Sequence, residues 1–241
     1  MPKRNIVRRR HNPVKRFTTH AIVTFAACLL LFAPAASGQQ VVDKIVATVN
    51  VSTEPDCKDN CLITYSDLLW QLALQPGTPL ASPSSDALNR ALRLTIDQRL
   101  ILQEAERLPT ISPSADEIRK ARDSLVKQFP SRAELQDRMT RVGLTSEKFD
   151  QILEQRVRIE KYLDFRFRSF IVVTPTEIEA YYRDDFTPQF KNRNPGRIVP
   201  SLQDVRGEIE RTLTENKVES DIDQFLDTAR DRADIVMVSP V

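Results

Sequence analysis

The chain has 241 residues, with 35 Lys or Arg, 33 Asp or Glu, 5 glycines and 2 histidines. Glycine this scarce disfavours phosphate-binding loops and many-stranded sheets rich in tight turns. The abundance of Leu, Gln and charged residues favours helices, so the composition predicts a mainly α protein.

Residues 1–38 have the features of a cleavable signal peptide. A basic leader from Lys3 to Arg16 precedes the apolar run Ala21–Ala33, and Ala36-Ser37-Gly38 supplies small residues for cleavage. The apolar run has 13 residues, fewer than the ~20 that a membrane-spanning helix needs. A retained membrane anchor is the alternative. We expect an exported protein whose mature part is residues 39–241.

The charge of the chain changes when the signal peptide is removed. Residues 1–38 hold seven basic and no acidic residues, so 35 basic against 33 acidic becomes 28 against 33. Both histidines, His11 and His20, also leave with this segment. An acidic mature chain offers no general attraction for nucleic acid or for an anionic membrane. We therefore expect no nucleic-acid partner and no stable membrane insertion after cleavage.

The mature chain begins with a predicted strand. Ile45, Val46, Val49 and Val51 are β-branched and lead into a polar, turn-forming segment. The other stretch of this character is 235–238, close to the C-terminus. A lone strand cannot satisfy its own backbone hydrogen bonds. We therefore expect a small two-stranded β element formed by the N- and C-terminal strands.

Cys57 and Cys61 are the two cysteines of the mature chain. In an exported protein, two cysteines that flank a reversing loop are expected to form a disulfide. A redox pair would more commonly have two intervening residues, whereas here there are three. A zinc site would need further cysteine or histidine ligands, which the mature chain lacks. We expect a structural disulfide, with redox chemistry and metal binding as the alternatives.

Helices fill the chain between the two strands. Their expected starts carry Ser or Thr side chains that can accept a backbone N–H, several with an acidic residue three positions later. These starts are Thr64 or Ser66, Ser85, Ser114, Ser131, Thr145, Thr174 and Ser201. The helix from Thr145 to about 171 is expected to be the longest. Residues 186–200 lack apolar periodicity and are expected to be a linker.

The mature sequence contains no recognisable catalytic constellation. Without histidine, a serine nucleophile would need a lysine as its base, and no Ser-x-x-Lys motif opens a plausible site. The adjacent acids Asp184 and Asp185 are expected to be solvated at a helix end. We expect no catalytic residue, no metal site and no small-molecule cofactor.

The order of several segments resembles the SurA-type periplasmic chaperone domain. A strand that ends in Val49-Asn50 precedes a capped helix, as in that domain, and the later helices follow in the same order. The similar segments are Val42–Asn50, Ile63–Leu68, Leu94–Ala105, Ile111–Ala121, Leu144–Ile159, Thr174–Tyr182, Pro200–Arg206 and Ala233–Ile235. The resemblance implies a multi-helix chaperone core that covers essentially the whole mature chain.

One departure from the family concerns prolyl isomerase activity. Relatives carry a parvulin domain at the position of residues 186–200, and this short segment has no room for one. The resemblance then implies a chaperone that binds unfolded outer-membrane or secreted polypeptides through an apolar groove, without catalysis. Candidate contacts are Trp70, Leu72, Tyr162 and Phe165. The alternatives are a prolyl isomerase with an unrecognised site and a partner dedicated to envelope assembly.

Overall fold

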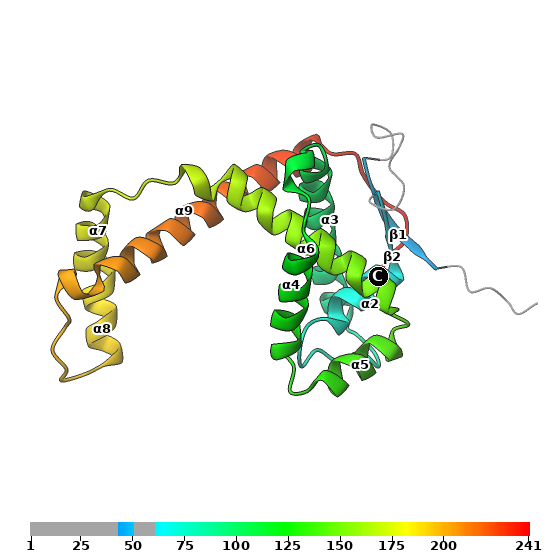
Figure 1. The fold of residues 1–241 in the computed structure, drawn as a ribbon, viewed down its shortest axis with the longest axis horizontal. Coiled ribbons are helices and arrows are strands. Elements are labelled where there is room, and N and C mark those ends of the chain that lie inside the picture. The colour runs from blue at the N-terminus through cyan, green and yellow to red at the C-terminus, as the bar shows by residue number, and fades with distance from the viewer. Residues whose placement is uncertain (1–42, 51–60) are drawn as a thin grey trace, which may run out of the picture. The chain divides into compact units, whose positions relative to one another are not determined.

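The computed structural model describes residues 43–50 and 61–241, and Figure 1 shows them as a ribbon. The predicted signal peptide, residues 1–38, and Cys57 lie outside the described residues. Cys61 is fully buried and disulfide-bonded. The fold is mainly α with one small antiparallel sheet, which confirms the predicted fold class.

The sheet joins the two ends of the described chain. Strand β1 (Ile45–Val49) lies between β2 (Leu62–Thr64) and β3 (Ile235–Met237), and both neighbours are antiparallel to it. The predicted pairing of the terminal strands is confirmed, with Val49 opposite Ile235. The expected number of strands was too low, since β2 makes the sheet three-stranded. With a strand on either side, β1 has both of its edges paired, which a two-stranded element could not provide.

The helical elements occupy most of the chain between β2 and β3. The α-helices are α2 (Tyr65–Ala73), α3 (Ser85–Glu106), α4 (Ala115–Lys127), α5 (Arg132–Arg141), α6 (Ser146–Arg166), α7 (Pro175–Tyr181), α8 (Thr187–Arg193) and α9 (Leu202–Arg232). Two short 3-10 segments, η2 (Pro109–Ile111) and η3 (Arg168–Phe170), and a π-helical segment, η4 (Tyr182–Phe186), complete the set.

Side-chain caps place most of the helix starts where the sequence predicts them. Complete capping boxes, with hydrogen bonds in both directions, form at Thr64, Ser114, Thr174 and Ser201. At Ser131 the serine oxygen accepts the Glu134 N–H, and the structure shows no return bond from the Glu134 side chain. These local bonds satisfy N–H groups that the first turn of a helix otherwise leaves without partners.

Two capping glutamates carry strongly lowered pKa values. Hydrogen bonds from the Ser114 backbone and the Lys161 ammonium lower the pKa of Glu117 from 4.5 to about 2. Lys217 and the Thr174 backbone do the same for Glu177, whose pKa is also about 2. The folded protein therefore binds these protons less readily than the unfolded chain does.

This difference makes the stability depend on pH. Since both folded pKa values are depressed, the stabilisation from Glu117 and Glu177 is fully present above pH 4.5 and is lost as the pH falls towards about 2. We expect the variant Glu117→Gln/Glu177→Gln to lose less of its melting temperature across this window than the parent protein. Thermal unfolding followed by circular dichroism at several pH values tests this expectation. The control Glu208→Gln/Glu210→Gln, on α9, should keep the parent slope.

Two expectations about the second half of the chain were wrong. Residues 186–200 are not an irregular linker, because Thr187–Arg193 form α8, which continues directly from η4. Stacked rings of Tyr182, Phe186 and Phe190, with centroids 5.8 and 5.9 Å apart, run along this segment. Among the described helices, α9 is the longest with 31 residues, whereas α6 has 21 and ends at Arg166.

Helix α9 contributes to three separate apolar clusters. Its first half packs Val205 and Ile209 with Ile178 of α7. Further along, Leu226 packs with Tyr162 of α6 and with α3, and Ala229 reaches the cluster beneath the sheet. At 1.5 Å rise per residue a 31-residue helix is about 46 Å long, so α9 runs from the α7 and α8 segment to α3 (Figure 1). Its middle section lies between these clusters.

Candidate binding groove

The middle of α9 faces α6 across an open groove. α3 contacts both helices and contributes Gln98 to the lining (Figure 1). The groove has a volume of 520 Å³, within the ~300–1,000 Å³ range of ligand pockets. Its size therefore suits several side chains of a bound molecule.

Four aliphatic side chains form the floor of the groove. Ile159 and Leu163 lie one turn apart on α6, and Val218 and Ile222 lie one turn apart on α9. Residues four positions apart share one face of a helix, so each wall presents a continuous apolar strip. Val218 is buried, and the other three are partly buried. A ligand with apolar side chains would bury the surface that these three still expose.

One arginine side chain closes one end of the groove. Arg168, at the start of η3, donates to both carboxylate oxygens of Glu215 on α9 at 2.7 and 2.8 Å. It also donates to Asp164 of α6 at 2.9 Å. The guanidinium lowers the pKa of Glu215 and keeps it ionised. This bidentate pair links α9 to the end of α6 at the exposed surface.

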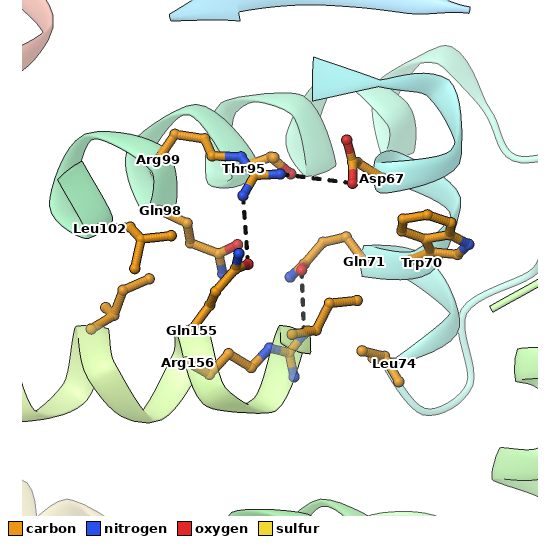
Figure 2. Close-up of a pocket in the computed structure, with 12 residues that line it drawn as sticks. Asp67, Trp70, Gln71, Leu74, Thr95, Gln98, Arg99, Leu102, Gln155 and Arg156 are labelled. Atoms are coloured by element: carbon orange, nitrogen blue, oxygen red, sulfur yellow. Dashed lines mark hydrogen bonds and ion pairs between the residues drawn. The ribbon is translucent and has the colours of Figure 1, made fainter. Parts of the chain in front are cut away.

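A second, smaller cavity adjoins the groove between α2, α3 and α6 (Figure 2). Its volume is 40 Å³, room for about two or three water molecules. Figure 2 shows Arg99 of α3 reaching Gln155 of α6 and Asp67 of α2, at 3.5 and 3.8 Å. This polar seam is too small for a polypeptide side chain of ordinary size. It instead joins the three helices.

Arg156 and Gln98 line both the small cavity and the groove. The Arg156 guanidinium donates to Gln71 of α2 at 3.2 Å, and desolvation lowers its pKa. No described carboxylate forms an ion pair with Arg156. Arg156 and Gln98 therefore bring N–H donors to the groove, and such donors can bind the carbonyl groups of an extended chain.

The four predicted contact residues do not come together at this groove. Leu72 and Tyr162 are 3% and 5% exposed, belong to two different apolar clusters and are not part of the groove lining. Burial, with a further contribution from Glu104, raises the pKa of the Tyr162 hydroxyl. Both side chains stabilise the core because they contribute large apolar surfaces to it.

The other two predicted residues are accessible in different ways. Trp70 is half-buried beside the small cavity, where its indole N–H donates to the Val142 carbonyl at 3.1 Å. The Lys148 ammonium lies 5.4 Å from the centre of its ring. Phe165 is 55% exposed on α6 and lies outside the groove lining. Trp70 thus has a structural role in linking α2 to α5 and α6.

The groove floor was not singled out from the sequence. Ile159, Leu163, Val218 and Ile222 were assigned only to the apolar stripes of their helices. On each helix, however, the apolar pair at i and i+4 is followed directly by an acidic pair at i+1 and i+5. This repeated pattern places acidic side chains beside the apolar strip of each helix, an arrangement that is also common on helices whose apolar strip packs in a core.

Membrane-spanning helices and metal clusters are absent from the part of the chain that the structure describes. In residues 43–50 and 61–241, no helix is long and apolar enough to cross a bilayer. The same residues contain no group of three or more His, Cys, Asp or Glu side chains placed to hold a metal ion.

Comparison with known proteins leaves the chain without an assigned family. No family model matches the sequence. A search of curated proteins finds no significantly similar sequence. The resemblance to the SurA-type domain therefore depends on the quoted segments and their order.

Proposed function

We propose that this protein is an exported, non-enzymatic chaperone that holds unfolded outer-membrane or secreted polypeptides in the periplasm. The observation that carries the proposal is the 520 Å³ groove between α6 and α9, with its aliphatic floor. Unfolded chains expose apolar side chains, and burying these against the floor is favourable without any requirement for a particular sequence. The resemblance to the SurA-type domain supports the same function.

The polar groups of the groove fit a polypeptide ligand. Apolar side chains alone would bind any hydrophobic surface, but the backbone of an extended chain also needs hydrogen-bond partners. Arg156 and Gln98 place donors at the edge of the apolar floor. A backbone carbonyl can accept from these donors whatever side chain follows it. This combination suits a binder of many different clients.

Neither alternative function gains support from a specific contact. Residues 186–200, where SurA-type proteins carry a parvulin domain, form the last residue of η4, all of α8 and a turn. Pocket residues in this segment, such as Phe190 and Arg193, surround a space of 320 Å³ against α9. A partner dedicated to envelope assembly would bind a single protein in the groove. A pull-down experiment distinguishes the two functions, because a general chaperone would capture many unfolded proteins and a dedicated partner only one.

The proposal predicts that purified residues 39–241 suppress the aggregation of a denatured outer-membrane protein on dilution, measured by light scattering. The variant Ile222→Trp should reduce this suppression severalfold, because the larger side chain occupies the space that a bound polypeptide needs. Leu94→Trp is the matched control, since Leu94 is an exposed aliphatic residue of α3 outside the groove. An Ile222→Trp protein with an unchanged melting temperature and full suppression would exclude this groove. No suppression by the parent protein at a molar excess would exclude the chaperone function.

A further inference from the structure

The charged residues that line the groove are mostly acidic. They are Arg156, Glu160, Asp164, Arg168, Glu215, Glu219 and Asp223. Five carboxylates and two guanidinium groups give a formal charge of minus three. This negative charge affects ligand binding, because a concave site with apolar walls concentrates the electric field of the charged residues around it.

Ion pairs do not cancel this charge. Arg168 is shared between Asp164 and Glu215, so these three residues together remain negative by one charge. Among the described residues, no lysine or arginine forms an ion pair with Glu160, Glu219 or Asp223. The last two lie one turn apart on α9, next to the apolar strip, and Glu160 lies on the facing helix. Exposed acids therefore flank both sides of the apolar floor.

Like charges on the two walls repel one another across the groove. Acidic side chains at i and i+4 destabilise a helix slightly, and α9 has this arrangement at Glu219 and Asp223. A ligand that brings positive charge between the walls removes the repulsion and gains an attraction. A neutral ligand leaves the repulsion in place, and an anionic ligand increases it.

We propose that the groove prefers cationic amphipathic segments of polypeptide, in which Lys or Arg flanks a short run of apolar residues. This inference rests on the proposed chaperone function and specifies the class of segment that the same groove binds. The apolar residues lie on the floor formed by both helices. The flanking cations lie beside Glu160, Glu219 and Asp223, where no cation of the described chain competes with them. A groove lined only by uncharged residues would not distinguish cationic segments from neutral or anionic ones.

The test uses three fluorescent peptides with the same apolar core, flanked by Lys, by Ser or by Glu. Binding to the purified full chain is measured by fluorescence anisotropy at low and at high salt. The Lys-flanked peptide is expected to bind about tenfold more tightly than the Glu-flanked peptide at low salt. The difference should shrink with added salt, because the Debye length falls from ~30 Å at 0.01 M to ~8 Å at 0.15 M.

A pair of double variants connects the preference to these acids. Glu219→Gln/Asp223→Asn removes two groove charges at nearly constant shape, and it should lower the affinity for the Lys-flanked peptide severalfold. Glu210→Gln/Asp221→Asn removes the same number of charges from α9 outside the groove lining. This control should retain most of the preference.

The possible results separate the inference from the chaperone proposal. Equal affinity for all three peptides, or an equal loss in both double variants, would overturn the charge preference while the apolar binding stands. Failure of every peptide to bind, together with no suppression of aggregation, would overturn the chaperone function itself. Tight binding of the Ser-flanked peptide alone would also contradict the preference.

Discussion

The variant Arg138→Met should lower the free energy of unfolding by about 3 kcal/mol, on the scale of charged hydrogen bonds whose loss leaves buried acceptors without partners. Arg138 of α5 is 9% exposed. It donates at 2.9 Å to the carbonyls of Leu72, Ala73 and Gln75 at the end of α2. Ala73 lies in the last turn of α2, where carbonyls lack intrahelical donors, whereas the Leu72 and Gln75 carbonyls also accept the backbone N–H groups of Gln75 and Thr78 at 3.2 and 3.4 Å. Methionine fills a similar volume but supplies no donor.

Thermal unfolding of residues 39–241 measures this effect. A loss of 1 kcal/mol shifts the melting temperature of a protein of this size by roughly 2–4 °C, so a shift of roughly 10 °C is expected for Arg138→Met.

The melting temperature of Arg138→Lys should lie between those of the parent and Arg138→Met, because an ammonium keeps the charge but lacks the planar arrangement of donors in the guanidinium. Arg141→Met is the matched control on α5. Arg141 pairs with Asp137 at the exposed surface at 2.6 Å, and such a pair contributes only about 0.5 kcal/mol. Equal shifts for Arg138→Met and Arg141→Met would contradict the capping role.

Deleting residues 235–241 should destabilise the fold by several kcal/mol, on the scale of burying one or two large apolar side chains. The deletion removes β3, the hydrogen bond from the Val238 N–H to the Val46 carbonyl at 2.8 Å, and the packing of Ile235 and Val241 on the cluster beneath the sheet. It also exposes one edge of β1, whose residues Val46 and Val49 are fully buried. The melting temperature of the truncated protein tests this expectation.

Two further variants separate the pairing of β3 from its exposed side chains. Val236→Thr/Met237→Thr changes side chains that are 48% and 56% exposed, so it should alter the melting temperature little. Removal of β1 should cost more than removal of β3, because β1 is the central strand and pairs on both sides. A truncated protein that melts at the parent temperature would show that the terminal pairing does not stabilise the fold.

Local sequence signals predicted most of the helix starts and the pairing of the two ends. A Ser or Thr followed three residues later by an acid satisfies two N–H groups within one turn, so its effect needs no distant partner. The caps at Ser114 and Thr174 are examples. The terminal strands were predictable for a different reason. Only two stretches had strand character, and each needed a partner.

Non-local packing explains where the sequence-based expectations failed. Thr187–Arg193 holds a single aromatic residue, Phe190, whose ring stacks on Phe186 of η4, and α8 continues directly from η4. Strand β2 has three residues, too few for a pattern of alternation to appear. Leu72 and Tyr162 have large apolar or aromatic side chains of the kind that bind ligands. Both are nevertheless buried, because neighbouring helices cover them. Sequence alone does not distinguish a covered apolar stripe from an open one.

By itself the sequence determined the fold class, the caps and the closure of the chain by its terminal strands, because each depends on short-range hydrogen bonding or on a simple need for a partner. The tertiary structure decided which apolar residues remain accessible. Arg168 of η3 and Glu215 of α9, 47 positions apart, form a bidentate pair at one end of the groove. Arg138 and the carbonyls of α2 are more than 60 positions apart. Such pairs form only after the helices have packed, and they place the candidate groove.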